Sequence, residues 1–212
     1  MSTHEVLLRI TGRVPKRSLR RMFPDVFKEA EQRQAECPVQ MGGPGNMELI
    51  YWLCEHTHAV KAVETGVAFG WSSLAFLLSL DTRAGALLIS TDMPYPLRNN
   101  DKYVGYIIPK TYRRSWKLYP YADRQALPRA IKKHLKVDIA HYDSDKSYEG
   151  RMWAYPQMWD SLFPGGVLLS DDISDNVAFR DFSLAMGVLP HVVEFDDIGG
   201  VKKYIGILVK PE

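Results

Sequence analysis

The chain is short of cysteine, of net charge and of long apolar runs, and each shortage excludes a class of protein. Its two cysteines, Cys37 and Cys54, have neither a disulfide nor a metal-type spacing, which suits a reducing compartment. The formal net charge is only +2, so overall charge does not indicate a nucleic-acid or membrane partner. No apolar run approaches the ~20 residues that span a bilayer, and no secretory apolar segment opens the chain. We therefore expect a cytoplasmic protein without a membrane partner.

The length and the apolar content predict a single α/β domain over residues 1–212. Hydrophobic residues make up 46% of the 212 residues, which is enough for one large core. Beyond residue 45, strand-like and helix-like segments alternate, and this alternation is typical of a mostly parallel sheet with flanking helices. We expect strands at 60–64, 85–91, 137–143 and 165–172, a final hairpin of 191–195 with 202–209, and helices from Asn46, Ser72 and Asp123.

Two basic segments fall outside this alternation. Residues 1–45 form a basic N-terminal arm, in which the stretch 11–24 has basic but no acidic side chains. Residues 93–120 form a long insertion in which aromatic side chains such as Tyr95 stand among basic ones such as Arg98. Because long connections in compact domains commonly serve as lids or binding loops, we expect 93–120 to cover a substrate. A solvated arm, an elaborated surface loop and a contact within a homo-oligomer remain alternatives.

A strand, a turn of small residues and a helix follow one another in residues 62–77. The strand ends at the acid Glu64, the turn carries Gly66, Ala68 and Gly70, and Ser72 opens the helix. Small residues let a ligand approach the bare backbone at the carboxyl end of the strand, where open α/β sheets bind nucleotides. A dinucleotide fingerprint needs glycine at the positions that Ala68 and Trp71 occupy, so NAD is disfavoured.

Acidic residues stand at the ends of four predicted strands. They are Glu64, Asp92, Asp143 and the pair Asp171 and Asp172. Because the carboxyl ends of parallel strands meet at one rim of a sheet, we expect these carboxylates to converge. An acid at the position of Asp92 commonly accepts hydrogen bonds from ribose hydroxyls, although each acid taken singly also fits a helix cap or a turn.

Three segments together resemble S-adenosylmethionine-dependent methyltransferases. The pattern E-x-G-x-x-x-G-x-S, which starts at Glu64, resembles motif I of the catechol and caffeoyl-CoA types of O-methyltransferase. The segment 141–150 resembles the D-A-D-K-x-x-Y segment of the caffeoyl-CoA type, and 164–176 completes that group's metal site. Macrolide and aminocoumarin sugar O-methyltransferases are more similar at Asp172, where the caffeoyl-CoA type often has asparagine. The resemblance covers residues 46–210 and implies a Rossmann-like seven-stranded, mostly parallel sheet with helices on both faces and an antiparallel last strand.

The resemblance implies S-adenosylmethionine as the cofactor and assigns residues to its parts. Glu64 is placed near the methionine part, Ser72 bonds its carboxylate, and Asp92 holds the ribose. Asp123 is placed near the adenine, although the family commonly has glycine before this acid and the chain has Ala122. The implied cofactor-binding residues are Glu64, Gly66, Ala68, Gly70, Ser72, Asp92, Asp123 and Asp143.

The same resemblance implies a divalent cation bound by Asp143, Asp171 and Asp172. Clustered carboxylates repel one another unless a cation neutralises them, and a set of oxygen ligands favours Mg²⁺, Mn²⁺ or Ca²⁺ over zinc. Asn176 is a candidate substitute ligand. The alternative for Asp171 or Asp172 is a helix cap.

Lys146, three residues after Asp143, stands at the position of the catalytic lysine of these enzymes. Desolvation and a nearby cation disfavour its ammonium form, so we expect Lys146 to accept a proton near neutral pH, with Asp143 beside it in the catalytic site. The alternative is a surface lysine paired with Asp145. His141 falls within an alternating strand, and we expect it to be a core residue.

These features predict a magnesium-dependent O-methyltransferase that acts on a small molecule with adjacent oxygens, such as a catechol, a phenol or a sugar diol. An N-methyltransferase acting on nucleic acid or protein is one alternative. Those acting on exocyclic amines typically carry N/D-P-P-Y after the fourth strand, where this chain has Asp-Ser-Asp-Lys. A non-catalytic S-adenosylmethionine-binding domain is the other alternative, which loss of Asp143 or Lys146 would have favoured.

Overall fold

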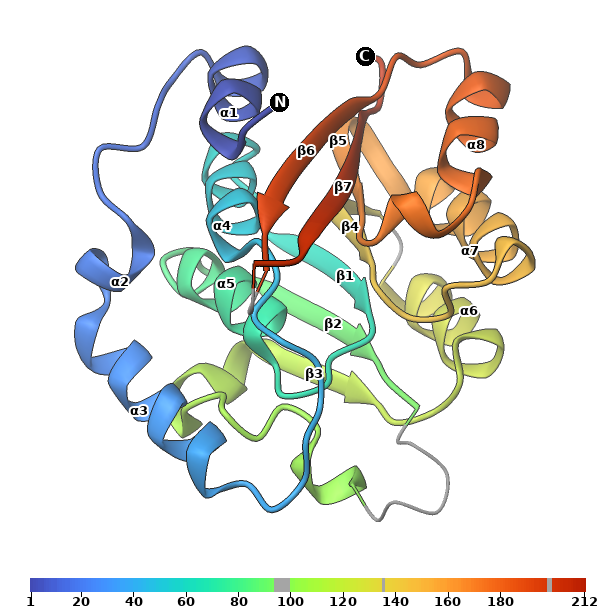
Figure 1. Cartoon of the computed structure of the whole chain (residues 1–212). Coiled ribbons are helices and arrows are strands. Elements are labelled where there is room, and N and C mark those ends of the chain that lie inside the picture. Colours follow the sequence, from blue (N-terminus) through green and yellow to red (C-terminus); the bar gives the residue numbers. More distant parts are fainter. Residues whose placement is uncertain (94–99, 135, 198–199) are drawn as a thin grey trace.

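Seven strands form one sheet in the order β3-β2-β1-β4-β5-β7-β6 (Figure 1). The computed structural model describes residues 1–93, 100–134, 136–197 and 200–212. Strands β1 to β5 pair in parallel, whereas β7 pairs antiparallel with β5 and with β6. The strands are β1 (Lys61–Thr65), β2 (Leu87–Thr91), β3 (Trp116–Tyr119), β4 (Val137–Tyr142), β5 (Leu162–Ser170), β6 (His191–Asp196) and β7 (Lys202–Val209). The predicted mostly parallel sheet with an antiparallel last strand is confirmed, as is the final hairpin.

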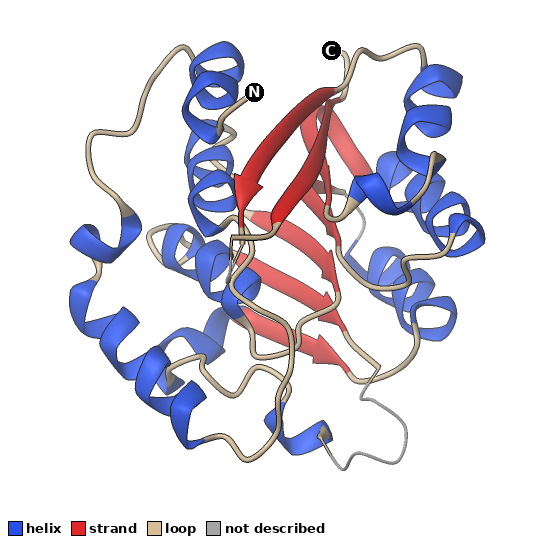
Figure 2. Cartoon of the chain, viewed as in Figure 1, coloured by secondary structure: helices blue, strands red, loops and turns tan. Residues whose placement is uncertain are grey.

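Helices cover both faces of the sheet, also as predicted (Figure 2). One face carries α1 (Thr3–Thr11), α4 (Met47–His56) and α5 (Trp71–Leu80), and the other carries α6 (Asp123–His134), α7 (Tyr148–Ser161) and α8 (Ala178–Met186). Because strand side chains alternate between faces, Ala62 of β1 packs in the core under the first group and Val63 in the core under the second. Within the described residues, no helix combines the length and the apolar composition needed to cross a membrane.

The N-terminal arm folds into helices that the sequence prediction did not include. Ser2 and Glu5 form a reciprocal capping box at the start of α1. Ahead of that helix, the Met1 carbonyl accepts a hydrogen bond of 2.9 Å from the Glu194 backbone N–H on the edge strand β6. Helices α2 (Leu19–Met22) and α3 (Pro24–Glu36) follow, and Phe27 of α3 stacks on Trp71 at the start of α5. The arm therefore covers the β6 edge of the sheet and the first residue of α5.

The predicted insertion 93–120 ends in a strand rather than in a loop. Residues 116–119 are the edge strand β3, paired in parallel with β2, and the short helices η1 (Asp101–Tyr103) and η2 (Lys110–Ser115) precede it. Ile107 and Ile108 are fully buried, and the Trp116 ring lies so close to Gly105 that a Cβ there would overlap it. The described part thus packs into the core, while Tyr95 and Arg98 lie outside the described residues. A lid over a substrate remains a prediction.

Candidate active site

The turn between β1 and α5 lies directly against the end of β4. Gly66 has φ +79°, and a Cβ at this position would overlap the backbone carbonyl oxygen of Asp143. Gly70 has φ +97° and is the N-cap of α5. A Cβ added to Gly70 would lie 3.0 Å from the Cα of Gly105. Both positions therefore need glycine, one because of β4 and the other because of the 93–120 segment. The glycine turn and the chain at Asp143 therefore lie in direct contact.

Asp92 holds the same turn from the end of β2. Its Oδ2 accepts hydrogen bonds from the backbone N–H groups of Val67, at 2.6 Å, and Ala68, at 2.9 Å. Ala68 lies in the left-handed region with φ 49°, where a residue with a Cβ is strained. The contact of Asp92 with a ribose stays a prediction, since one of its oxygens is engaged with the turn.

Replacing Ala68 with glycine tests this local strain. The Ala68→Gly variant is expected to be more stable than the wild type by about 0.5–1 kcal/mol, because glycine adopts the left-handed conformation without the Cβ penalty. Urea unfolding followed by circular dichroism measures the difference. A variant less stable than the wild type would show that the Ala68 methyl group contributes more through packing than its conformation costs.

Glu64 is fully buried beneath the start of α5. Its carboxylate accepts hydrogen bonds from the hydroxyls of Ser73, Ser72 (3.2 Å) and Ser90 (2.7 Å). Burial raises the pKa of Glu64, although these serines oppose the shift. Glu64 and Ser72, both predicted to contact the methionine part of a cofactor, thus bond to each other. The first backbone N–H groups of α5 lie beside them and are suited to a carboxylate.

The raised pKa of Glu64 predicts a pH-dependent stability difference for Glu64→Gln. A carboxyl group whose pKa is higher in the folded than in the unfolded protein loses stability as pH rises through the unfolded value. The glutamine variant has no such loss. The measured quantity is the free energy of unfolding of Glu64→Gln minus that of the wild type. We expect this difference to increase from about pH 4 to about pH 7. Urea titrations at both pH values measure it, and a difference that stays constant or falls contradicts the assignment.

Asp123, the predicted adenine contact, begins α6 and faces the ends of β2 and β4. Its Oδ1 accepts a hydrogen bond of 3.0 Å from the Thr91 hydroxyl, and its Oδ2 accepts one from Ser144. Burial raises the pKa of Asp123 against the effect of these two hydroxyls. The Ser144 hydroxyl also lies 2.9 Å from the Thr65 hydroxyl, within hydrogen-bond distance, so Asp123 is tied to the ends of three strands. Its role toward adenine is untested.

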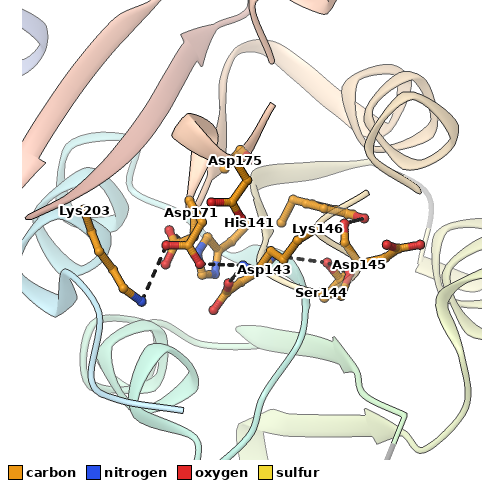
Figure 3. Close-up of polar contacts among 12 residues, drawn as sticks. His141, Asp143, Ser144, Asp145, Lys146, Asp171, Asp175 and Lys203 are labelled. Carbon is orange, nitrogen blue, oxygen red and sulfur yellow. Dashed lines mark hydrogen bonds and ion pairs between the residues drawn. The ribbon is translucent and has the colours of Figure 1, made fainter. Parts of the chain in front are cut away.

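Asp143, Asp171 and Asp172, hereafter the acid corner, lie at the ends of β4 and β5. Figure 3 shows Asp143 and Asp171 together with Lys146. The Lys146 ammonium forms ion pairs with Asp143 Oδ1 and, at 3.0 Å, with Asp172 Oδ2. Burial and the nearby Asp171 raise the pKa of Asp143 to about 6. The prediction of a neutral Lys146 does not fit these contacts. Burial lowers its pKa, but Asp143 and Asp172 outweigh burial and raise the pKa above its ordinary value.

Three further side chains hold the acid corner, and the sequence prediction assigned none of them this role. His141 is buried, and its Nε2 lies 3.1 Å from Asp171 Oδ1. Arg151 of α7, fully buried, donates to the Asp172 carbonyl oxygen at 2.9 Å. Asn176 uses its Nδ2 to donate to the Lys146 carbonyl at 2.8 Å and its Oδ1 to accept from the Ala178 N–H at 3.0 Å. Both ends of the Asn176 amide are thus engaged, which argues against Asn176 as a substitute ligand.

The acid corner does not present three converging metal ligands in the described part of the chain. No group of three or more His, Cys, Asp or Glu side chains there could hold a metal ion. Its oxygens have the chemistry that Mg²⁺ prefers, but Asp172 faces two ammonium groups, those of Lys146 and Lys203. In these positions the three acids do not fit a shared divalent cation.

The sheet order, the glycine turn and the acids at the strand ends define the fold of class I S-adenosylmethionine-dependent methyltransferases. The sequence profile described as a methyltransferase domain matches residues 63–173, just over half of the chain. The chain therefore belongs to the methyltransferase domain family. No curated protein sequence matches it significantly.

Solved structures share this fold over nearly the whole chain. An O-methyltransferase from Bacillus cereus in complex with SAH is similar with a TM-score of 0.67 and 14% identity, covering 97% of each chain. A putative O-methyltransferase from Klebsiella pneumoniae has a TM-score of 0.62 and 14% identity, covering 98% of this chain and 96% of its own. The O-methyltransferase TomG from Streptomyces achromogenes, involved in tomaymycin synthesis and solved with SAM, has a TM-score of 0.65 and 14% identity, with the same coverage of 98% and 96%. At these identities the similarity establishes the fold alone.

Proposed function

We propose that this methyltransferase uses S-adenosylmethionine to methylate a hydroxyl group of a small molecule that carries a second oxygen beside it. The observation that carries this proposal is the contact of Gly66 with the Asp143 backbone. It places the Lys146–Asp143 pair next to the turn that would bind the methionine part of the cofactor. The Bacillus cereus enzyme in complex with SAH and TomG in complex with SAM, which share this fold, support the cofactor.

The chain's own residues would act through charge and position. The O–H bond of the acceptor breaks, an O–CH₃ bond forms, and the S–CH₃ bond of the sulfonium breaks to leave S-adenosylhomocysteine. We assign the departing proton to Asp143 and the stabilisation of the developing oxyanion to the Lys146 ammonium, 3.0 Å from Asp172 Oδ2. Because a cation and an oxyanion lose charge in the transition state, the protein contributes mainly by holding the reacting atoms in line.

The predicted Mg²⁺ stays a prediction in this proposal. If a divalent cation binds, Asp143 and Asp171 are the residues that would hold it, and it would lower the pKa of a chelated hydroxyl. Because Asp172 is engaged by lysines, no step of the proposal depends on the metal. The buried free thiols Cys37 and Cys54 support the cytoplasm as the proposed compartment.

Release of S-adenosylhomocysteine with different classes of acceptor tests the proposal. The protein is incubated with S-adenosylmethionine and, separately, a catechol such as 3,4-dihydroxybenzoate, a sugar diol, an RNA pool and a histone mixture. Methylation of a hydroxyl on the catechol or the sugar supports an O-methyltransferase. Methylation of a nitrogen on RNA or protein supports the first alternative instead. Tight S-adenosylhomocysteine binding without turnover on any acceptor favours the non-catalytic alternative.

A further inference from the structure

We propose that Lys203 is a built-in counter-ion of the acid corner and removes Asp172 from the predicted metal-ligand set. Lys203 lies near the start of β7, and this strand runs antiparallel to β5. Its first residues therefore lie at the rim where the parallel strands end, and Lys203 contacts Asp172 there. Figure 3 shows Lys203 at this rim. The Lys203 Nζ lies 3.5 Å from Asp172 Oδ1 and 3.1 Å from Asp197 Oδ2.

Asp172 is held on both its carboxylate and its backbone. Lys146 contacts Oδ2 at 3.0 Å and Lys203 contacts Oδ1, so each carboxylate oxygen faces one ammonium group. The backbone of Asp172 has φ 51° in the left-handed region, and the guanidinium of Arg151 donates to its carbonyl oxygen. These contacts come from three elements: the segment after β4, helix α7 and strand β7. They orient Asp172 toward lysines.

A divalent cation at this corner competes with the lysines for the same oxygens. Asp143 contributes one oxygen to Lys146, and Asp171 contributes one to His141. Their second carboxylate oxygens have no ion-pair partner among the described residues. A cation that binds there gains two carboxylates but meets the positive charge of Lys203 across Asp172, which weakens binding in a partly buried site. Removing Lys203 takes away this positive charge and frees the Oδ1 oxygen of Asp172, and it is therefore expected to strengthen metal binding.

Binding of Mn²⁺ alone to the full chain, followed by electron paramagnetic resonance of the free ion, tests this inference. Lys203→Met is compared with Lys202→Met, which removes the same charge from the neighbouring residue of β7. Lys202 pairs with Glu194 and its side chain is 62% exposed. We expect Lys203→Met to bind Mn²⁺ at least about tenfold more tightly than the wild type, and Lys202→Met to stay within about twofold. Circular dichroism confirms that each variant is folded.

Adding Asp172→Asn to each background tests whether Lys203 weakens metal binding through the Asp172 carboxylate. We expect Asp172→Asn to reverse the gain of Lys203→Met and to leave the weak binding of the wild type nearly unchanged. Equal Mn²⁺ affinities for Lys203→Met and Lys202→Met would overturn the inference. The inference would also be overturned if, in the otherwise wild-type protein, Asp172→Asn weakened Mn²⁺ binding as much as Asp171→Asn does. The readout is independent of methyl transfer, and S-adenosylhomocysteine binding measured on the same samples tests the proposed function separately.

Discussion

Gly66→Ala is expected to lower the affinity for S-adenosylhomocysteine by more than about 100-fold. The new Cβ would overlap the Asp143 carbonyl oxygen, which is backbone at the end of β4 and cannot rotate away. Either the turn or the end of β4 must shift, and both carry residues proposed to bind the cofactor or the acceptor. A left-handed alanine adds roughly 1–2 kcal/mol of strain to the folded state. Isothermal titration calorimetry measures the affinity.

Gly85→Ala is the matched control for this variant. Gly85 also has a positive φ, of +72°, but a Cβ there meets nothing within 4 Å. We expect this variant to lose about 1–2 kcal/mol of stability from strain and to bind S-adenosylhomocysteine like the wild type. If the two variants had equal affinities, the close approach of the turn to β4 would not matter for the cofactor.

Lys146→Met is expected to lower kcat by about 10²–10⁴-fold, on an acceptor found by the release assay, while the affinity for S-adenosylhomocysteine changes less than about threefold. The Lys146 ammonium forms its ion pairs with Asp143 and Asp172, at the ends of β4 and β5, and not with the glycine turn or the start of α5. Its loss therefore removes a positive charge from the reacting oxygen and leaves the cofactor turn in place. Initial rates of methyl transfer at saturating substrate concentrations measure kcat.

Lys136→Met serves as the control, since Lys136 donates to the Asp160 carbonyl on the surface between β4 and α7. Its kcat should match that of the wild type. Lys146→Arg keeps the positive charge but replaces the ammonium with a planar guanidinium, and it is expected to retain more activity than Lys146→Met. Equal losses of kcat and of cofactor affinity in Lys146→Met would assign Lys146 to cofactor binding instead.

The parallel sheet was predictable because each of its buried strands is a short apolar run that ends in a polar residue. Strand β3 was missed because its four residues, Trp116 to Tyr119, share the aromatic and basic composition of the segment before them. What distinguishes β3 is its tertiary environment: it pairs with β2, and the segment before it packs on the glycine turn. The capping box of Ser2 and Glu5, by contrast, is a local pattern that could have indicated α1.

The candidate site was predictable to the extent that it follows from strand ends. Asp143, Asp171 and Asp172 lie at the same edge of the sheet because the carboxyl ends of neighbouring parallel strands lie together. The side chains that neutralise them depend on tertiary structure. Lys203 reaches the corner only because β7 is inserted antiparallel beside β5, and Lys146 keeps its charge because two carboxylates outweigh its burial. The three-residue spacing pairs Lys146 with Asp143, but no spacing in the sequence brings Asp172 or Lys203 to them.

Calorimetric titration of the wild type with S-adenosylhomocysteine, repeated with Mg²⁺ and with EDTA, tests the central claim most directly. The account predicts saturable 1:1 binding in both buffers, because it assigns cofactor binding to the glycine turn, Asp92 and the start of α5 and not to a metal at the acid corner. No binding of S-adenosylhomocysteine at millimolar concentration in either buffer would contradict the cofactor site and, with it, the proposed methyl transfer.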